Sequence, residues 1–431
     1  MLSLSEGWIM GPIARTTLKT TAVFGLRLVV QAATLLLVAH ALGPDAYGAF
    51  AGVIGLAVFL GSLAGFGMPL LQLRASAAVP GENQEALPYA FPVVLLSGFS
   101  LLGIYVPLCL YLFPSARLGA GFLLAFGFSE LVVQPLLVLF ASMRHGAGEV
   151  VKSQLLQVMP LVLRTAAAGA VVLLAPASPL LWYCMAYLVA TLVAFTVAWN
   201  GSAVAGFRSW RLPRSAEWRL AFGFAAAEVS RNGPTELDKS VAMRFLGGSD
   251  AGLYAAGSRI VAAFVLPVMA MVVSSLPRLF READGKRVPV RLIAAMLASS
   301  CIYGVVMAPL LCLGVPWIDG LFGADYVGVG DIVAAMGIVV PGLAMRLVSG
   351  YVLMVLGRVW WRVSVEFFGV FLMAFSGYFL IPETGVMGMV HALAFSEWGM
   401  VFCSLLVISI DLFKVRDPRD ERLMGRRSDG N

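Results

Sequence analysis

The chain has 431 residues, of which 60% are hydrophobic and only 13% are charged, and its mean hydropathy is +0.89. Soluble domains carry about 25% charged residues, so this composition excludes an ordinary soluble protein. The net charge of +6 is not concentrated in any soluble domain of useful size, so we expect no nucleic-acid partner.

Apolar segments recur along the whole chain, each close to the roughly 20 residues that a membrane-spanning helix needs. We therefore expect an all-α, polytopic membrane protein with about twelve transmembrane helices. The predicted spans cover residues 17–41, 46–73, 88–112, 118–141, 151–174, 180–205, 219–246, 250–277, 291–314, 328–356, 359–381 and 386–411.

The positions of the basic residues predict the orientation. If both termini and the even-numbered loops are cytoplasmic, those segments hold 22 of the 30 lysines and arginines, and the opposite loops hold only Arg117. This asymmetry follows the positive-inside rule. The other seven basic residues lie inside predicted spans, where a charge is costly and usually faces a cavity or a partner.

A polar stripe interrupts the first span at positions i, i+4 and i+7, which lie on one face of a helix. It consists of Arg27, Gln31 and Thr34. The stripe returns 204 residues later as Arg231, Thr235 and Asp238. The same offset pairs Leu42-Gly43 with Leu246-Gly247, Gly48 with Gly252, Phe50 with Tyr254, and Arg74 with Arg278.

This repeat predicts two six-helix halves with the same topology in both. The predicted divisions are an N-terminal lobe at 1–206, a cytoplasmic linker loop at 207–219, a C-terminal lobe at 220–411 and a cytoplasmic tail at 412–431.

The embedded arginines are the candidate substrate-binding residues, because a guanidinium can hold a phosphate through two hydrogen bonds. The candidates for the cavity and for a diphosphate are Arg27, Gln31, Arg164, Arg231, Arg259 and Arg346. The alternative for each arginine is an internal ion pair with an embedded acid. Arg27 has no acid nearby in its own span, which favours ligand contact.

Span seven, 219–246, is rich in charge, and a hydropathy plot alone would make it a loop. One Arg-rich loop precedes span seven and another follows span eight, and both should lie on the cytoplasmic side of the membrane. The chain must therefore cross the membrane twice between them, so span seven must be a crossing as well as span eight. Gly233 and Pro234 lie near the middle of span seven and predict a kink or a short unwound segment that acts as a hinge. A static kink is the alternative.

Glu228 and Asp238 are candidates for binding a coupling ion, because a carboxyl group in a dry cavity can load and release a proton. Neutralising a neighbouring arginine is the alternative role. The five cysteines show no metal-ligand spacing, so we expect no metal, and the absence of a P-loop motif argues against ATP hydrolysis by that route. We expect no cofactor, no catalytic residues and no enzyme activity, because the exterior loops are too short to hold an active site.

Three short motifs follow predicted spans one, seven and nine. They are LGPDAYG at 42–48, LGGSDAGLYAA at 246–256 and LFGADY at 321–326, with LPRLF at 276–280 closing the second of them. With the arginine of the first span, they make the chain resemble the polysaccharide-exporter branch of the multidrug/oligosaccharidyl-lipid/polysaccharide exporter superfamily, the O-antigen type flippases.

The resemblance implies two six-helix, pseudo-symmetric lobes around a central cavity, in a flippase of the bacterial cytoplasmic (inner) membrane. Its substrate would be an undecaprenyl-diphosphate-linked oligosaccharide, the repeat unit of a polysaccharide or O-antigen, moved to the outer leaflet by alternating access with proton or cation coupling. Implied partners are the lipid bilayer and the polysaccharide polymerase and chain-length proteins. Arg27 and Arg259 correspond, by helix and approximate depth, to cavity arginines of lipid II flippases.

Three other functions stay open at this point. A multidrug or cation antiporter of the same superfamily would favour an acidic cavity, whereas basic residues slightly outnumber acids within the spans. A membrane glycan polymerase or ligase would normally carry a large exterior loop, and the exterior loops here are short. A scaffold without transport activity would not need the repeated arginine.

Overall fold

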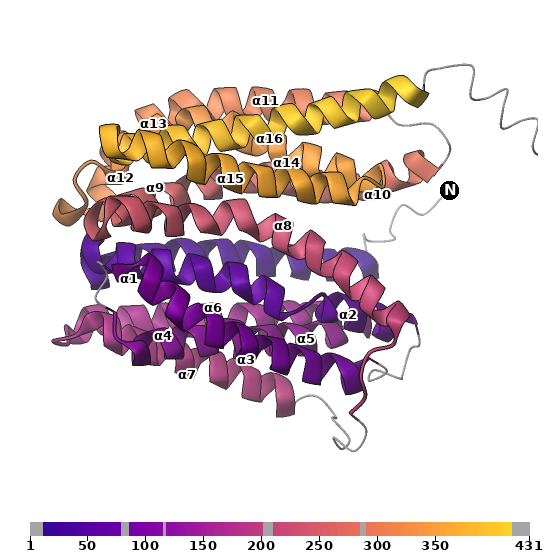
Figure 1. Cartoon of the computed structure of the whole chain (residues 1–431), viewed down its shortest axis with the longest axis horizontal. Helices are drawn as coiled ribbons and strands as arrows, with labels where there is room; N and C mark the ends of the chain where they lie inside the picture. Colours follow the sequence, from indigo (N-terminus) through magenta and orange to yellow (C-terminus); the bar gives the residue numbers. More distant parts are fainter. Residues whose placement is uncertain (1–11, 79–85, 115–117, 201–209, 285–289, 416–431) are drawn as a thin grey trace, which may run out of the picture. The chain divides into compact units, whose positions relative to one another are not determined.

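The computed structural model describes residues 12–78, 86–114, 118–200, 210–284 and 290–415 (Figure 1). Within these ranges every regular element is a helix and no strand occurs, as the sequence predicts. Ten helical stretches in the described part of the chain are long and apolar enough to cross a membrane. The protein is therefore a multi-pass, all-α membrane protein.

Two features relate these ten stretches to the twelve predicted spans. The stretch 29–64 passes through Gly43, whose backbone is not helical (φ 70°, ψ 169°), so two helices meet there across a kink. Span seven is helical as predicted and lies within a helix of 32 residues. Its charged residues make it too polar to count among the ten apolar stretches.

The chain divides into two compact units. The first contains residues up to Asn232 and the short segment 247–252. Its helices before α8 are α1 (Pro12–Ala64), α2 (Met68–Ala78), α3 (Leu87–Leu112), α4 (Ala120–Gly127), the π-helical η2 (Phe128–Val133), α5 (Gln134–Gly146), α6 (Val150–Leu174) and α7 (Pro179–Asn200). Within this unit α1 and α7 pack on α6, and α2 packs on α5.

Aromatic rings form much of the interior of the first unit. Phe50 of α1 contacts Phe126, Tyr183 and Tyr187, with ring centroids 5.4, 5.6 and 6.4 Å apart. Such tilted and edge-on pairs add roughly 0.5–1.5 kcal/mol each beyond the burial of apolar area. This cluster holds α1, α4 and α7 together beside the polar groups described below.

The second unit contains residues 233–246 and the chain from Leu253 onward. Its elements, beginning with the end of α8 (Ser215–Leu246), are α9 (Gly248–Phe264), α10 (Leu266–Asp284), α11 (Val290–Leu313), α12 (Val315–Phe322), η3 (Ala324–Tyr326), α13 (Val329–Ala335), η4 (Met336–Ile338), α14 (Val339–Val355), α15 (Val359–Thr384) and α16 (Val386–Val415). Its apolar core joins α10, α11, α14 and α16, and includes Val272, Met296 and Val348.

Helix α8 belongs to both units, because the division falls between Asn232 and Gly233 inside the helix. The division between the two compact units therefore lies within α8. The helix continues through Pro234 without an unwound turn, and Gly233 and Pro234 are both buried. The predicted hinge at these two residues stays a prediction.

Large apolar side chains lie exposed on the outer faces of the helices. Examples are Leu173, Trp182 and Phe371, which are 86%, 59% and 64% exposed. Soluble proteins rarely expose extended apolar surface of this kind, and a lipid environment removes the cost. These faces are those that we expect to contact the bilayer.

Three glycines share one unusual backbone conformation, and each ends a helix in one of the three sequence motifs. Gly43, Gly247 and Gly323 have φ values of 70°, 86° and 80°, with ψ values of 169°, −176° and −173°. This region of backbone space is essentially restricted to glycine. Gly43 and Gly247, which are 204 residues apart, thus have the same local structure, which is consistent with the repeat and is shared by Gly323.

Candidate functional site: intramembrane arginines and their partners

The polar stripe of the first span lies along α1. Gln31 is exposed, Arg27 is half-buried and has a polar partner, and the Thr34 hydroxyl lies 2.5 Å from the hydroxyl of Thr165 in α6. Thr34 therefore packs between two helices of the first unit. Arg27 and Gln31 remain the candidates on α1 for substrate contact.

The repeated stripe lies along α8. Arg231 belongs to the helix, but its side chain lies outside the described residues. Glu228, one turn earlier, is half-buried and takes part in a polar interaction. The predicted substrate role of Arg231 and the predicted coupling role of Glu228 stay predictions.

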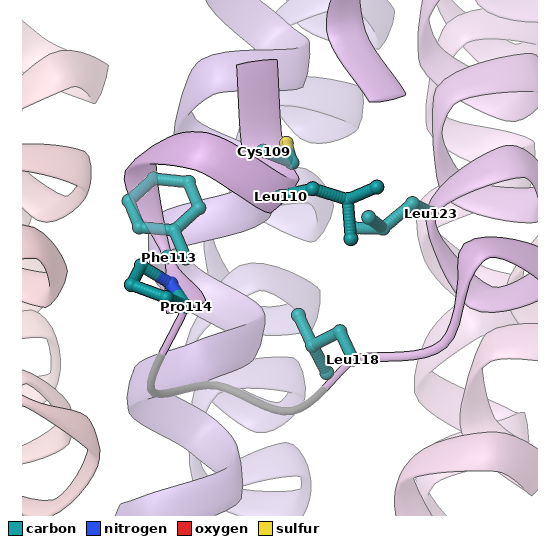
Figure 2. A pocket seen from close by; sticks show the side chains of 6 residues that line it. All are labelled: Cys109, Leu110, Phe113, Pro114, Leu118 and Leu123. Carbon is teal, nitrogen blue, oxygen red and sulfur yellow. The ribbon is translucent and has the colours of Figure 1, made fainter. Parts of the chain in front are cut away.

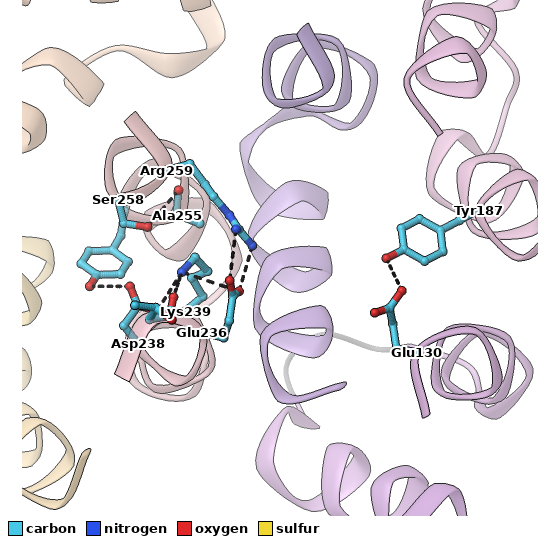
Figure 3. Close-up of polar contacts among 10 residues, drawn as sticks. Glu130, Tyr187, Glu236, Asp238, Lys239, Ala255, Ser258 and Arg259 are labelled. Carbon is cyan, nitrogen blue, oxygen red and sulfur yellow. Dashed lines mark hydrogen bonds and ion pairs between the residues drawn. The ribbon is translucent and has the colours of Figure 1, made fainter. Parts of the chain in front are cut away.

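Arg164 of α6 forms a buried network within the first unit. Its Nη2 donates to Glu130 Oε1 at 2.9 Å and to Thr191 Oγ1 at 2.7 Å, and its guanidinium lies 3.5 Å from the centroid of the Tyr187 ring. The Tyr187 hydroxyl donates to the same oxygen of Glu130 at 2.6 Å (Figure 3). The arginine thus has a charge partner, a hydroxyl acceptor and an aromatic face.

Glu130 lies in η2, the π-helical segment between α4 and α5. Pro135 follows shortly after it, and a proline has no N–H to donate to the carbonyl one turn back, which favours a local widening of the helix. Single π-helical turns occur frequently at functional sites. Here the irregular turn carries the carboxylate that pairs with Arg164.

Two further ion pairs lie at the α8–α9 end of the second unit (Figure 3). The Arg259 guanidinium donates to both oxygens of Glu236, at 3.2 and 2.9 Å. Lys239 Nζ donates to Asp238 Oδ1 at 2.8 Å, and the Tyr254 hydroxyl donates to Asp238 Oδ2 at 3.2 Å. Arg259 is 40% exposed, so it remains accessible to a ligand, whereas Asp238 is enclosed.

Arg346 of α14 lies between two carboxylates in the interior of the second unit. Its Nε donates to Glu397 of α16 at 2.6 Å, and its Nη1 donates to Glu366 of α15 at 2.9 Å. All three residues are at most 7% exposed. Arg362, one turn before Glu366, is also buried and lies 5.2 Å from the ring centroid of Tyr351.

The two interior networks have opposite arrangements of charge. In the first unit the acid lies on η2 and the arginine on α6, which follows α5. In the second unit the arginine lies on α14 and the acids on the two following helices. Each network joins consecutive spans of one unit, which neutralises the embedded charge and holds the helices in register.

The described part of the chain also contains a small pocket at the turn between α3 and α4 (Figure 2). Its lining is apolar apart from the thiol of Cys109, and includes Phe113, Leu118 and Leu123. It contains no charged group that could hold an anion. No cluster of three metal-ligating side chains occurs among the described residues.

The end of the linker loop is fixed to the first unit at the predicted cytoplasmic side. Both oxygens of Glu217 accept from Arg211, at 2.7 and 2.6 Å, and the Arg211 guanidinium lies 4.2 Å from the ring centroid of Tyr89. Glu217 Oε2 also accepts from the Arg214 backbone N–H at 2.6 Å, which caps α8. These hydrogen bonds, that from Arg211 above all, lower the pKa of the Glu217 carboxyl.

We expect Glu217→Gln to lower the stability of the protein at neutral pH by at most about 1 kcal/mol, since the pair is partly exposed. The folded-state pKa lies below the unfolded value of about 4.3, so the contribution is complete above that value and disappears as pH falls through the folded pKa. Thermal unfolding of both proteins between pH 7 and pH 3 measures this. Glu383→Gln, at an exposed carboxylate, is the control, and a difference that did not change with pH would contradict the assignment.

The sequence analysis did not predict the tyrosine and threonine residues that take part in these networks. Tyr187 and Thr191 lie four residues apart, on one face of α7, within an otherwise apolar run. That spacing was the available signal. The sequence offered weaker evidence that Tyr254 belongs to a polar network. The repeat pairs Tyr254 with Phe50, so the second half carries a hydroxyl at a position where the first half has none.

Several solved structures share the arrangement of these helices. Among solved structures, the chain is similar to the inward-facing conformation of a multidrug resistance MATE family transporter of the MOP superfamily, with a TM-score of 0.69 at 13% identity over 90% of this chain and 95% of that one. At such identity the likeness establishes the fold and no more. No family model and no curated protein matches the sequence.

Two other solved structures are also similar to the chain. The lipid II flippase MurJ, in an inward closed conformation, gives a TM-score of 0.67 at 14% identity over 93% of this chain and 90% of that one. A MOP superfamily transporter from Pyrococcus furiosus, whose reversed binding-pocket polarity suggests a different function, gives 0.62 at 14% identity over 94% and 96%. One fold therefore accommodates pockets of different polarity.

Proposed function

We propose that this protein is a membrane transporter that flips an undecaprenyl-diphosphate-linked oligosaccharide, the repeat unit of a surface polysaccharide, from the inner to the outer leaflet of the bacterial cytoplasmic membrane. It does so by alternating access. The observation that carries the proposal is an intramembrane arginine at the same position in the first helix of each half, Arg27 and Arg231. The shared backbone conformation of Gly43 and Gly247 supports the offset that relates the two arginines.

The other embedded cations divide by their exposure. Arg164 and Arg346 are enclosed in networks with acids of their own unit, which favours a role in holding helices together. Arg259 pairs with Glu236 but stays 40% exposed, so it can exchange this partner for a substrate phosphate. The diphosphate would therefore contact Arg27, Arg231 and Arg259, with Gln31 as a neutral donor beside them.

We expect the double variant Arg27→Ala, Arg231→Ala to abolish flipping. Each lost charge-assisted hydrogen bond costs about 1.5–3 kcal/mol, roughly tenfold or more in rate per arginine. The measurement is the amount of lipid-linked oligosaccharide on the cytoplasmic leaflet of a deletion strain complemented with each variant. Wild-type protein should clear this lipid, and the double variant, at equal expression, should not.

A matched control uses the other repeat-related arginines. Arg74→Ala, Arg278→Ala removes the same charge at the predicted cytoplasmic ends of the spans, so it should leave flipping close to wild type. Arg27→Lys, Arg231→Lys should retain partial activity, because lysine keeps the charge and loses the fork of donors. A deletion strain with intact surface polysaccharide and no accumulated lipid would reject the flippase.

A multidrug antiporter is the second candidate, and the likeness to a MATE family transporter supports it equally well. The buried carboxylates Glu366 and Glu397 would serve such an exchanger as proton-binding groups. The same deletion strain separates the two candidates. Sensitivity to cationic drugs with normal surface polysaccharide would favour the antiporter.

A further inference from the structure

The end of the linker loop and the first turns of α8 expose arginines and large apolar side chains side by side along the chain. Six such residues between positions 210 and 222 are called the linker strip below. They are Trp210, Leu212, Arg214, Arg219, Leu220 and Phe222. The linker strip contains two cations and no acid, and all of it belongs to the first unit.

The local backbone explains why these side chains point outward. Ahead of α8, exposure alternates along the chain as in an extended segment: Leu212 is 80% exposed, Pro213 is buried and Arg214 is exposed. Within α8, Arg219 and Phe222 are three residues apart and so lie on one face of the helix. The basic and the apolar side chains of the strip are therefore available to the same ligand.

Residues on the inner side fix this segment to the first unit. The Arg211 backbone N–H donates to the carbonyl of Pro88 at 3.2 Å, and the Arg211 guanidinium lies over the ring of Tyr89 at the start of α3. A Cβ atom on Gly67, between α1 and α2, would overlap the carbonyl of Ala221, so that turn packs directly on the backbone of α8. The strip is thus held in position before a ligand arrives, which lowers the entropy cost of binding.

The two arginines of the strip keep their charge available. Arg211 uses both of its terminal nitrogens on Glu217, so that pair is neutral. Among the described residues, neither the Arg214 nor the Arg219 guanidinium forms an ion pair. The strip therefore presents a net charge of two protons' worth beside exposed apolar surface.

We propose that the linker strip binds anionic phospholipids of the surrounding membrane, whose phosphates pair with Arg214 and Arg219 while their chains contact the apolar side chains. Charge complementarity decides the ligand. A soluble anion would leave Leu212 and Phe222 in water, and a neutral lipid would not use the arginines. Arginine and tryptophan are also the residues that meet headgroups at a membrane surface. The inference does not depend on which molecule the protein transports.

The experiment measures which lipids lie beside the strip. A fluorophore is attached to Ala216→Cys, an exposed position between the two arginines, after replacement of the five native cysteines. The full-length protein is placed in phosphatidylcholine nanodiscs that contain a minor fraction of brominated phosphatidylglycerol or of brominated phosphatidylcholine. Each arginine near a membrane surface should enrich the anionic lipid roughly fivefold, so the brominated phosphatidylglycerol should quench several times more strongly. Both leaflets carry the same mixture, so the orientation of the protein does not affect the result.

Substitutions then assign the enrichment to the strip. Arg214→Gln, Arg219→Gln should reduce quenching by phosphatidylglycerol to the level of phosphatidylcholine, and Arg214→Lys, Arg219→Lys should retain most of the difference because the charge remains. Arg74→Gln, Arg244→Gln is the matched control, since it removes the same charge at two exposed positions outside the strip. This control should quench as the wild-type protein does.

Three results would reject the proposal. The first is equal quenching of the Ala216→Cys label by the two brominated lipids. The second is an equal preference for phosphatidylglycerol at a label on Leu174→Cys, which is 75% exposed at the end of α6, because general attraction by the basic protein would then explain the enrichment. The third is loss of the enrichment on adding millimolar inorganic phosphate at constant ionic strength, which would show that the arginines recognise a free anion and not a lipid.

Discussion

Replacing Arg346 with methionine is expected to lower the stability of the folded protein by about 3–5 kcal/mol. The variant leaves Glu366 and Glu397 without the guanidinium that neutralises them, and both are almost fully buried. Removing one partner of a buried ion pair is costly because the remaining charge is neither solvated nor compensated. Thermal unfolding of the purified protein in nanodiscs measures the loss.

Two variants test that explanation for Arg346. Arg358→Met removes an arginine that pairs with Asp411 at 2.6 Å near the protein surface, where it is 46% exposed, and no measurable change is expected. The triple variant Arg346→Met, Glu366→Gln, Glu397→Gln should recover most of the stability, because it removes the buried charges together. Equal destabilisation in the single and triple variants would indicate that packing, and not charge, explains the loss.

Glu130→Ala is expected to destabilise the first unit by a similar amount, about 3–5 kcal/mol. The substitution removes the acceptor of both Arg164 and Tyr187 and leaves the guanidinium buried. Glu130→Gln should cost less, since the amide oxygen can still accept from the Tyr187 hydroxyl. Unfolding of the single variants Glu130→Ala and Arg164→Met, and of the double variant that combines them, completes a double-mutant cycle.

The coupling energy between Glu130 and Arg164 shows whether the two side chains stabilise each other. The second substitution should recover stability in the absence of Glu130, because it removes the orphaned charge. Glu149→Ala is the matched control, as it breaks ion pairs with Arg144 and Lys152 in which the carboxylate is 38% exposed. Additive losses at Glu130 and Arg164 would show that the two side chains do not stabilise each other.

Much of the fold could be predicted because hydropathy and charge act locally. A run of apolar residues needs about 20 positions to cross a bilayer, and this requirement located most spans directly. Span seven was located by the side on which its flanking arginines must lie, and it forms a helix although its residues are polar. The LG pairs at residues 42–43 and 246–247 indicated turns in the sequence. The backbone conformations of Gly43 and Gly247 at these turns are ones that need glycine.

The partners of the embedded charges could be predicted only as a choice between two roles. The spacing of Arg346 and Glu397 along the chain does not state that α14 and α16 lie side by side, so ligand contact and ion pairing were both open. The structure pairs them at 2.6 Å. The π-helical turn at Glu130 depends on a competition between Pro135 and the surrounding packing, which no local pattern resolves.

Helix α8 connects two sets of contacts through a fixed number of residues. Phe222 packs on Phe66 near its start, and Asp238 bonds to Tyr254 near its end. Each added residue turns a helix by about 100° and lengthens it by about 1.5 Å, so a single insertion between these contacts would point one set away from its partners. Across evolution, this helix should therefore accept many substitutions but keep its length.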